Sequence, residues 1–421
     1  MNFEAAVGYL LGLGHETLTI KLGLRNTELL LNALDNPERA FQSVQIAGTN
    51  GKGSTAAMLD LICRAAGIRT GLYTSPHLVS ITERIKCSGT DITREDFAAC
   101  ATVVRDVCEQ LLRDKHIEAL PTFFEQLTAI ALLAFRNAGV ELAILETGLG
   151  GRLDSTTAAN AHIVGITSIA LDHQEYLGNT IESIAREKAA IIRPGVRAVI
   201  GRQEYPEALD VLLQRCEETG VTPTLVGHDS NSIEERVTLA LRGRHQIDNA
   251  AVAIRLAELL CETGFNIPHA AIVTGLETVQ HPGRLELIQH KPAFLIDGAH
   301  NPAGAKSLRS YLDEFALHPL TLVFGAMRDK QLEEIGEILF PSADLLVLTT
   351  VDNPRSATLE MLEPIARRFA LGNILKSDVS AEALQIALAN TSSEGMICIA
   401  GSLYLVGELR PQILRLSQEN K

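Results

Sequence analysis

The segment Gly-Thr-Asn-Gly-Lys-Gly-Ser, residues 48–54, limits the fold of this chain more than any other feature. The apolar run 44–47 before it predicts a strand, and residues 56–66 after it have apolar side chains at helical spacing. A strand, a glycine-rich loop and a helix form the arrangement that binds nucleotide phosphates. The glycines let backbone N–H groups turn inward, and the N-terminus of the helix favours an anion. The segment therefore predicts a nucleotide-binding α/β fold.

Two side chains of this segment are candidates for contacts to phosphate and metal. Lys52 brings a positive charge toward the outer phosphates of ATP, and the Ser54 hydroxyl can reach a metal-bound group. The spacing is unusual, because only Thr49 and Asn50 stand where the common phosphate loop has four residues before its Gly-Lys pair. A plain glycine turn is the alternative interpretation. Glycines, a lysine and hydroxyls gathered in one loop favour ATP binding.

Length, charge and cysteine content exclude several classes of protein. At 421 residues the chain exceeds the size at which one core keeps growing, so two domains are expected. The net charge of −14 argues against nucleic acid as a partner, because a phosphate backbone needs a basic surface. No apolar run approaches the length of about twenty residues that a membrane span needs, and the N-terminus resembles no signal peptide. Scattered cysteines without a CxxC pair argue against zinc and fit a reducing cytoplasm.

Short apolar strands alternate with longer helices along the first half of the chain. This alternation is typical of a parallel sheet with helices on both faces, whose ligands gather at the carboxyl ends of the strands. Residues 219–244 interrupt the alternation and predict a small antiparallel excursion. The predicted strands and helices of this half lie at 70–74, 94–112, 122–135, 142–145 and 163–167.

A second series of the same kind begins near residue 293. Asn301 and Pro302 predict a helix start, with asparagine as N-cap and proline in the first turn. The chain is thus expected to be α/β, with a phosphate-loop ATP-binding domain containing a parallel sheet over 1–291 and a smaller Rossmann-like α/β domain over 292–421. The predicted strands and helices of the second series lie at 294–296, 320–324, 332–339, 345–348, 359–370, 381–389, 396–399 and 401–414.

Two carboxylates and one imidazole follow predicted strands at the edge where ligands are expected. Glu146 ends the strand 142–145 and precedes a glycine-rich loop, so it is placed to hold Mg²⁺ directly or through water. Asp172 and His173 follow the strand 163–167 and its extension, where they suit a second divalent site or an orienting pair. The alternatives are a solvated loop carboxylate for Glu146 and a structural histidine for His173.

Lys188 falls on the apolar stripe of a predicted helix over 181–192, four residues after Ile184 and three before Ile191. Lysines are rarely buried without a partner. The side chain either extends its ammonium group to water or lies near the site with a lowered pKa or a covalent modification. The sequence does not choose between these interpretations.

The segment 122–125, Thr-Phe-Phe-Glu, supports two interpretations that are compatible. Thr122 and Glu125 have the spacing of a capping box, in which both side chains satisfy N–H groups of a helix start. Phe123 and Phe124 beside a carboxylate can also stack on a planar heterocycle.

Three further candidates lie around the predicted domain junction. Asn249 opens a helix over 250–260, Arg284 sits in a compact basic turn, and Asp297 joins a strand to a helix. Arg284 can reach phosphates, and Asp297 a ribose hydroxyl or an amine. Each is individually more often a turn or cap residue, but two-domain enzymes place their sites at such junctions.

Together these segments resemble the folylpolyglutamate synthases, including the bifunctional dihydrofolate synthases, of the Mur ligase superfamily. The resemblance covers essentially the whole chain. It rests on residues 48–54, Ser75-Pro76-His77-Leu78, and residues 122–125, 146–154, 171–173, 186–188, 281–284, 297–302 and 401–404.

The resemblance implies an ATP-dependent amide ligase that is a monomer. ATP phosphorylates a folate carboxylate, and the amine of L-glutamate attacks the resulting acyl phosphate. It also implies two Mg²⁺ ions and a carbamylated Lys188. By position it assigns catalysis to Lys52, Lys188 and His173; ATP binding to Thr49, Asn50, Gly51, Lys52, Gly53, Ser54, Asn249, Arg284 and Asp297; metal binding to Ser75, Glu146 and His173; and the pterin pocket to Thr122, Phe123, Phe124, Glu125, Leu153, Asp154 and Ser155.

One departure and three rival functions remain open at this point. Some bifunctional members read Asp-Leu-Gly-Leu where this chain reads Lys21-Leu22-Gly23-Leu24, and the acid belongs to a region that helps bind dihydropteroate. Attachment of the first glutamate is therefore open.

A muramyl-peptide ligase would carry a UDP-binding domain before the phosphate loop, whereas only 47 residues precede Gly48. A P-loop switch ATPase would need no second domain, and a small-molecule kinase would release a phosphorylated product.

Overall fold

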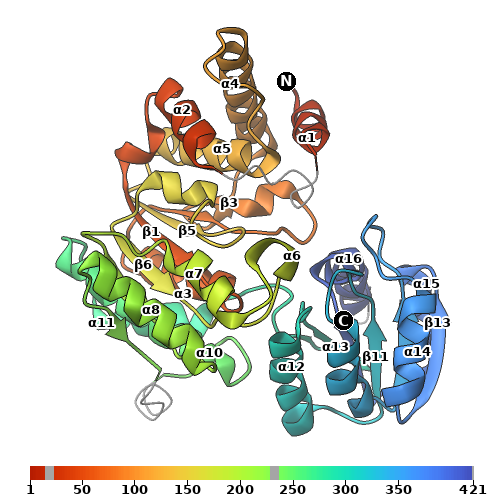
Figure 1. The fold of residues 1–421 in the computed structure, drawn as a ribbon. Helices are drawn as coiled ribbons and strands as arrows, with labels where there is room; N and C mark the ends of the chain where they lie inside the picture. The colour runs from red at the N-terminus through yellow and green to blue at the C-terminus, as the bar shows by residue number, and fades with distance from the viewer. Residues whose placement is uncertain (15–22, 228–236, 420–421) are drawn as a thin grey trace. The chain divides into compact units, whose positions relative to one another are not determined.

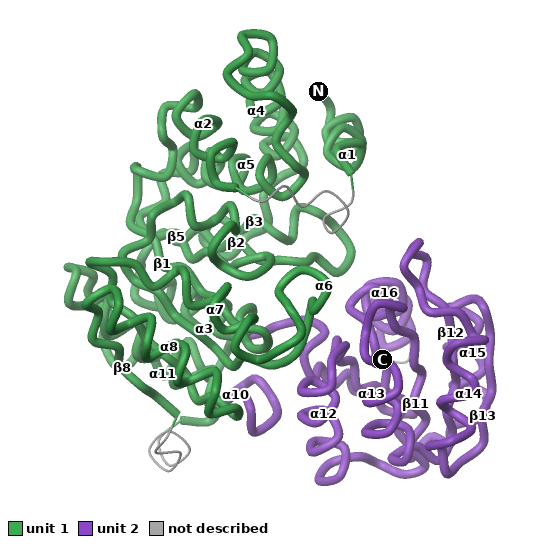
Figure 2. The backbone as a smooth tube through the Cα atoms, viewed as in Figure 1, with its two compact units in different colours: residues 1–239, 247–279 green, residues 240–246, 280–421 purple. Residues whose placement is uncertain are grey.

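The computed structural model describes residues 1–14, 23–227 and 237–419. The chain forms two compact units, coloured separately in Figure 2: residues 1–239 with 247–279, and residues 240–246 with 280–421. The second unit begins before the expected boundary at 291/292. The reason is that β9 (Glu286–Ile288) pairs antiparallel with β10 (Ala293–Ile296) and so belongs to the second sheet.

The first unit contains an eight-stranded sheet in the order β4-β3-β2-β5-β1-β6-β7-β8. β3 and β4 run antiparallel to their neighbours, and the other strands pair in parallel. The predicted antiparallel excursion over 219–244 is wrong for β8, which pairs in parallel with β7; residues 228–236 lie outside the described part. The strands are β1 (Gln42–Ala47), β2 (Thr70–Tyr73), β3 (Ile85–Cys87), β4 (Thr90–Asp91), β5 (Leu142–Glu146), β6 (Ile163–Ile166), β7 (Arg197–Ile200) and β8 (Thr224–Leu225).

Local sequence signals begin and end several helices of this unit. Thr122 and Glu125 form the predicted capping box at the start of α5, and Gly67, with φ +82°, follows the end of α3. The helices are α1 (Phe3–Gly12), α2 (Arg25–Ala33), α3 (Lys52–Ala65), α4 (Arg94–Arg113), α5 (Phe123–Asn137), α6 (Gln174–Leu177), α7 (Ile181–Ala189), α8 (Pro206–Thr219), α10 (His245–Glu262, whose first two residues belong to the second unit) and α11 (His269–Thr278), with 3₁₀ turns at Pro37–Ala40, Ile81–Arg84 and Ser155–Ala159.

Helices cover both faces of this sheet, as Figure 1 shows. On one face Gly71 lies against Phe135 of α5, and on the other Gly165 lies against Val252 and Leu256 of α10. A methyl group added at Gly71 would collide with Phe135, and one added at Gly165 would press on Leu256. The sheet is therefore closed to solvent on both faces near its centre, and ligands can reach its central strands only at an edge.

The second unit is a six-stranded sheet in the order β13-β12-β11-β14-β10-β9, parallel except for β9. Its core includes Phe324 and Phe340, whose rings meet edge to face at 5.0 Å. Asn301 caps the predicted helix at Pro302, since its Oδ1 accepts from the Gly304 N–H at 2.8 Å. The remaining elements are β11 (Leu320–Phe324), β12 (Leu345–Thr349), β13 (Asn373–Ser377), β14 (Met396–Ala400), α12 (Pro302–Phe315), α13 (Leu332–Leu339), α14 (Leu359–Phe369), α15 (Ser380–Asn390), α16 (Leu403–Glu419) and a 3₁₀ turn at Phe340–Ser342.

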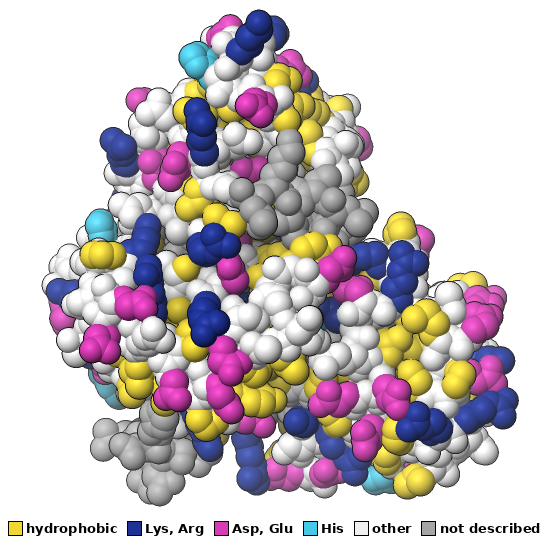
Figure 3. All heavy atoms as spheres, in the orientation of Figure 1, with side chains coloured by type: hydrophobic (Ala, Val, Ile, Leu, Met, Phe, Trp, Pro, Cys, Tyr) yellow, Lys and Arg dark blue, Asp and Glu magenta, His cyan; other side chains and the backbone are white. Residues whose placement is uncertain are grey.

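Acidic and basic side chains are interspersed over the face of each unit seen in Figure 3, in a chain of net charge −14. None of the described helices is long and apolar enough to cross a membrane. The α/β fold class expected from the sequence is confirmed in both units.

Candidate active site

The central strands of the first unit bring three loops to one edge of the sheet. β1 lies between β5 and β6, with Ile46 in register with Glu146 and Ala47 in register with Ile166. All three strands run in the same direction, so the loops that follow them start side by side. These loops carry the phosphate-loop segment 48–51, the glycine-rich segment 147–154 and the segment 167–173.

The phosphate loop has the backbone geometry that its glycines predict. Gly51 has φ +89° and precedes α3 directly, and a side chain there would overlap the amide of Asn249 on α10. Thr49 is tied to the loop after β6: its N–H donates to the Ser168 carbonyl at 2.8 Å and its hydroxyl to the Ala170 carbonyl at 3.0 Å. Hydrogen bonds thus fix the segment as a loop at a helix N-terminus, which is the geometry of an anion-binding site.

The other residues of the first unit that the sequence predicts to bind the nucleotide lie close to this loop. The Asn50 carbonyl accepts from the Ser168 hydroxyl at 3.4 Å, and Thr55 donates to the Asn249 carbonyl at 3.4 Å. Gly53 and the buried Ser54 lie in the first turn of α3. The structure therefore gathers the predicted nucleotide residues of the first unit around one helix start.

Two lysines donate to the same carbonyl of this loop. Lys52 Nζ lies 3.1 Å from the Gly48 oxygen and 3.2 Å from the Thr49 oxygen, and Lys188 Nζ lies 2.7 Å from the Gly48 oxygen. Lys188 is 4% exposed, in the last turn of α7, so its amine is not extended to water. The pKa of Lys188 is lowered to about 7, chiefly by burial and also by the positive charge of Lys52, whereas Asp172 and Asp154 act in the opposite direction.

The predicted metal ligands include a buried carboxylate at the end of β5. Glu146 is 5% exposed, and its Oε2 accepts from the Ser75 N–H at 3.2 Å, which brings these two residues together. His173 follows β6 with φ +49°, and its N–H donates to Asp172 Oδ1 at 2.8 Å. A carboxylate, a hydroxyl and an imidazole are chemically suited to a divalent cation. Among the described residues no three His, Cys, Asp or Glu side chains cluster as a preformed metal site.

Of the residues 122–125 expected around a planar ring, Phe124 is partly accessible and the others are buried or engaged at the helix start. Phe124 is half-buried, lies 5.8 Å from the ring of Tyr73, and would collide with any side chain at Gly148. Phe123 is buried, and Thr122 and Glu125 are engaged at the start of α5. Phe124 is therefore the member of this segment best placed to meet a ligand.

Asp154 organises the loop after β5 from inside. Its Oδ2 accepts from the N–H groups of Gly148 and Leu149 at 2.8 and 2.9 Å, and burial raises its pKa. Leu153 beside it is half-buried, and Ser155 Oγ lies 2.6 Å from Thr128 Oγ1. Asp154 thus holds the glycine-rich loop in shape.

The predicted nucleotide residues of the second unit surround one carboxylate. Asp297 is 8% exposed, and its two oxygens accept from the N–H groups of Leu285 and Ala299, each at 2.8 Å. Arg284 precedes Leu285, which has φ +42°. His245 faces the same group: burial lowers its pKa, Asp297 raises it and Arg284 lowers it. Asp297 therefore fixes the backbone that presents Arg284.

Two residues in the first unit were not identified from the sequence. Arg84 is buried, donates from Nε to His77 Nδ1 at 2.7 Å and lies over the Phe123 ring at 5.6 Å. Gln203 donates from Nε2 to the Thr167 carbonyl and accepts at Oε1 from the Ile169 N–H. The sequence around Arg84, residues 80–87, mixes polar and apolar side chains, so no local signal singles out this arginine.

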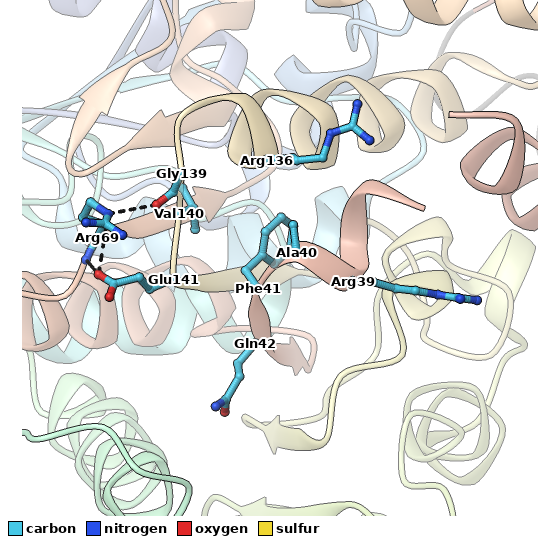
Figure 4. Close-up of a pocket in the computed structure, with 9 residues that line it drawn as sticks. All are labelled: Arg39, Ala40, Phe41, Gln42, Arg69, Arg136, Gly139, Val140 and Glu141. Carbon is cyan, nitrogen blue, oxygen red and sulfur yellow. Dashed lines mark hydrogen bonds and ion pairs between the residues drawn. The ribbon is translucent and has the colours of Figure 1, made fainter. Parts of the chain in front are cut away.

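A surface hollow of about 620 Å³ lies elsewhere on the first unit (Figure 4). The hollow lies at the amino ends of β1, β2 and β5, and Gln42, Arg69 and Glu141 are among the residues that line it. Arg69 is engaged with the Gly139 carbonyl and with Glu141. The hollow is therefore at the opposite edge of the sheet from the phosphate loop and contains none of the predicted site residues.

Family models match both units. Residues 46–205 match the Mur ligase middle domain, and residues 283–403 match the Mur ligase glutamate ligase domain. A dihydrofolate synthase/folylpolyglutamate synthase from Bacillus subtilis is 33% identical, over 94% of this chain and 95% of the relative. A probable bifunctional folylpolyglutamate synthase/dihydropteroate synthase from Haloferax volcanii is also 33% identical, but the chain spans about half of its length (50%).

Solved structures agree with these matches over nearly the whole chain. A Mycobacterium tuberculosis folylpolyglutamate synthase complexed with ADP and AMPPCP has a TM-score of 0.87 and 32% identity, covering 98% of this chain and 99% of that chain. Escherichia coli FolC in complex with DHPP and ADP has a TM-score of 0.87 and 29% identity, covering 99% and 98%. A bifunctional synthase from Yersinia pestis, complexed with AMPPNP and Mn, has a TM-score of 0.83 and 27% identity, covering 98% of each chain.

Proposed function

The chain belongs to the Mur ligase family, in the group of the folylpolyglutamate and dihydrofolate synthases, and from this membership we propose that it is an ATP-dependent amide ligase that adds L-glutamate to folates. The folate carboxylate attacks the γ-phosphorus of ATP and ADP leaves. The glutamate amine then attacks the acyl-phosphate carbon, loses a proton, and inorganic phosphate leaves. Such chemistry needs reactants held in line and negative charge neutralised.

One observation carries the proposal: two lysine amines meet on the Gly48 carbonyl of a loop at a helix N-terminus. On binding ATP, Lys52 is proposed to exchange its contacts with the Gly48 and Thr49 carbonyls for phosphate oxygens. Thr49, Asn50, Gly51, Gly53 and Ser54 present the backbone and hydroxyl groups around it, and Asn249 packs on Gly51. Arg284 and Asp297 of the second unit are also proposed to bind the nucleotide.

We propose two Mg²⁺ sites, with Ser75, Glu146 and His173 as the protein ligands. The support is the buried Glu146 carboxylate beside Ser75 and the Mn bound by the Yersinia pestis relative. When bound, Mg²⁺ neutralises charge on the phosphate oxygens. Asp172 Oδ1 accepts from the His173 N–H and so holds the backbone of His173 in the loop after β6.

Lys188 is proposed to be carbamylated. Burial favours its neutral amine near pH 7, and a neutral amine is the form that takes up CO₂. The carbamate would place a negative charge next to the positive charge of Lys52, whereas a protonated Lys188 would repel it.

Phe124, Leu153 and Ser155 are proposed to contact the pterin ring, and Thr122, Phe123, Glu125 and Asp154 to shape its pocket; Ser155 Oγ lies 3.5 Å from the Phe124 carbonyl. Tetrahydrofolate polyglutamylation is the first candidate activity. Dihydropteroate is a second candidate acceptor, favoured by the DHPP complex of the Escherichia coli relative. Lys21, the departure noted in the sequence, lies outside the described residues.

The test is phosphate release from Mg-ATP and L-glutamate with tetrahydrofolate or dihydropteroate added separately. Release with a mass gain of one glutamyl unit on either acceptor supports the proposal and identifies the acceptor. Release without any acceptor would instead identify a switch ATPase, and a phosphorylated product that accumulates would identify a kinase. A UDP-muramyl peptide that alone supports release would identify a muramyl-peptide ligase.

We also propose a monomer that works in the cytoplasm. All seven cysteines are free thiols, which fits a reducing compartment. Sedimentation of the purified chain at 45.5 kDa would support the monomer, and twice that mass would contradict it.

A further inference from the structure

Two carboxylates of the second unit hold the backbone on either side of Arg284. The Gly283 N–H donates to Glu286 Oε2 at 2.9 Å, and the Leu285 N–H donates to Asp297 Oδ2 at 2.8 Å. The residue before this arginine and the residue after it are therefore each tied to an acidic side chain. The direction in which the Arg284 side chain leaves the backbone depends on both of these hydrogen bonds.

The turn that carries Arg284 has a conformation that an unconstrained chain rarely adopts. Gly283 has φ +72°, and the buried Leu285 has φ +42°, in the left-handed region that a leucine occupies only at a cost. Such conformations persist where the surrounding contacts enforce them. Loss of one of the two carboxylate contacts should therefore let the turn relax and redirect Arg284.

Arg410 of α16 fixes the orientation of the Glu286 carboxylate. Its Nε lies 3.1 Å from Glu286 Oε1 and 2.8 Å from Oε2, and its Nη2 lies 2.7 Å from Oε1. The two side chains are only 22% and 20% exposed, so solvent screens the pair weakly. A bidentate pair between a guanidinium and a carboxylate restricts the rotation of both groups. The acceptor of the Gly283 N–H is thus itself held by a distant part of the chain.

The turn places the guanidinium of Arg284 at the carboxyl edge of the second sheet. Gly298 follows β10, and its N–H donates to the Gly283 carbonyl at 2.8 Å. A Cβ added to Gly298 would lie 3.3 Å from Arg284 Nη1, so the guanidinium lies beside this glycine. Open α/β sheets bind their ligands at this edge.

We propose that Arg410 and Glu286 form a positioning pair that holds the turn 283–285 and directs Arg284 toward the nucleotide. The inference rests on the proposed nucleotide binding by Arg284 and adds two residues that act on it from outside the site. Neither member of the pair contacts the nucleotide, since both act through the Gly283 backbone. Loss of the pair should therefore weaken nucleotide binding only to the extent that Arg284 contributes to it.

The experiment is a double-mutant cycle on the full chain, with the Kd for Mg-ADP measured by isothermal titration. Arg284→Gln should raise this Kd at least about thirtyfold, because it removes a charged partner of the phosphates. Arg410→Gln alone should raise it about tenfold, which is a usual size of coupling between residues of one network. In the Arg284→Gln background, Arg410→Gln should change the Kd less than about twofold, because the guanidinium that the pair directs is gone.

Three further variants test the same contacts. Glu286→Gln replaces the carboxylate by a neutral amide, so it should also raise the Kd only when Arg284 is present, and it covers the case in which Arg410→Gln does not fold. Arg410→Lys keeps the charge without the bidentate geometry and should show an intermediate Kd. Arg368→Gln, at an exposed arginine paired with Glu333 in the same unit, is the matched control and should bind Mg-ADP as wild type does.

An equal loss of affinity from Arg410→Gln with and without Arg284 would show a general structural role and would overturn the inference. An unchanged Kd in both Arg410→Gln and Glu286→Gln would overturn it as well. Failure of the proposed function gives a different result, because Arg284→Gln would then bind Mg-ADP as wild type does, and the nucleotide role of Arg284 would be lost together with the inference.

Discussion

The lowered pKa of Lys188 makes the stability of the fold depend on pH. Its pKa, lowered to about 7, means that the folded protein holds a neutral amine above that pH, whereas an unfolded chain keeps the proton up to about 10.5. Folding therefore gains stability as the pH rises through this window, because the unfolded state binds the extra proton. The same deprotonation makes the amine available to CO₂.

The first prediction concerns this carbamate. With ¹³C-bicarbonate, a carbamate resonance should be present at pH 8 and disappear as the pH falls below about 7, following protonation of Lys188. Lys188→Arg should abolish the resonance, since a guanidinium does not react. Lys306→Arg, at an exposed lysine of the second unit, should leave it unchanged. An unmodified Lys188 in intact-mass spectra at pH 8 would contradict the proposed modification.

The second prediction concerns Glu146 as a metal ligand. Glu146→Gln removes the charge but keeps the shape of the side chain. The Mg²⁺ concentration for half-maximal activity should therefore rise and kcat should fall. We expect kcat/KM to decrease at least about a hundredfold. Titrating activity with Mg²⁺ and Mn²⁺ measures both effects. Glu141→Gln, just before the opposite end of the same strand, is the control and should behave as wild type. Unchanged metal dependence in Glu146→Gln would remove this residue from the site.

At the scale of elements, helix α3 lies between two glycines whose backbone has the left-handed conformation that glycine adopts most easily. Gly51 has φ +89° and faces the Asn249 amide, whereas Gly67 at the end of α3 has φ +82° and no heavy atom within 4 Å of an added Cβ. The two positions thus share the backbone strain and differ in what surrounds them.

The third prediction uses this pair. Gly51→Ala should abolish detectable ADP binding in isothermal titration, because the methyl group displaces Asn249 and reshapes the loop. Gly67→Ala should cost roughly 1–2 kcal/mol in the free energy of unfolding and leave ADP affinity unchanged. If both variants bind ADP as wild type does, the loop after β1 is not the nucleotide site.

Elements with strong local signals were predictable from the sequence, and elements defined by distant pairing were not. Thr122, Gly67 and Asn301 mark helix ends through side-chain or backbone chemistry within one turn, and the structure has a helix end at each. The orientation of β8 depends on pairing with β7, across α8, and no local signal reports it. Helix α7 ends at Ala189 rather than at residue 192, as boundaries are often misplaced by a few residues.

In the candidate active site too, residues with a local sequence signal were predictable and residues that depend on distant contacts were not. Glu146 and the phosphate loop were recognisable because each follows an apolar strand directly. Arg84 and Gln203 act through contacts with His77 and with the loop 167–169, which the fold alone brings near them. Asp154 was expected at a ligand, and the structure shows its carboxylate holding backbone N–H groups.

At the scale of the whole molecule, the chain passes between its units more than once. Residues 240–246 belong to the second unit, and residues 247–279 return to the first before the chain continues at 280. Helix α10 therefore starts in one unit and continues in the other, with His245 near Asp297 and Asn249 against Gly51. Cutting the chain at one point cannot separate the units cleanly, so their stabilities are best compared in the intact protein.

The fourth prediction is that the intact chain unfolds in two calorimetric transitions, because each unit has its own sheet and its own buried core. Leu145→Ala in the first core and Leu348→Ala in the second should each cost about 2–5 kcal/mol and lower a different transition. Mg-ADP at about a hundred times its Kd should raise the transition that Leu145→Ala lowers, by about 2.7 kcal/mol, since the phosphate loop lies in that unit. A single transition shifted equally by both variants would show that the two cores unfold as one, and a nucleotide shift confined to the Leu348→Ala transition would move the main nucleotide contacts to the second unit.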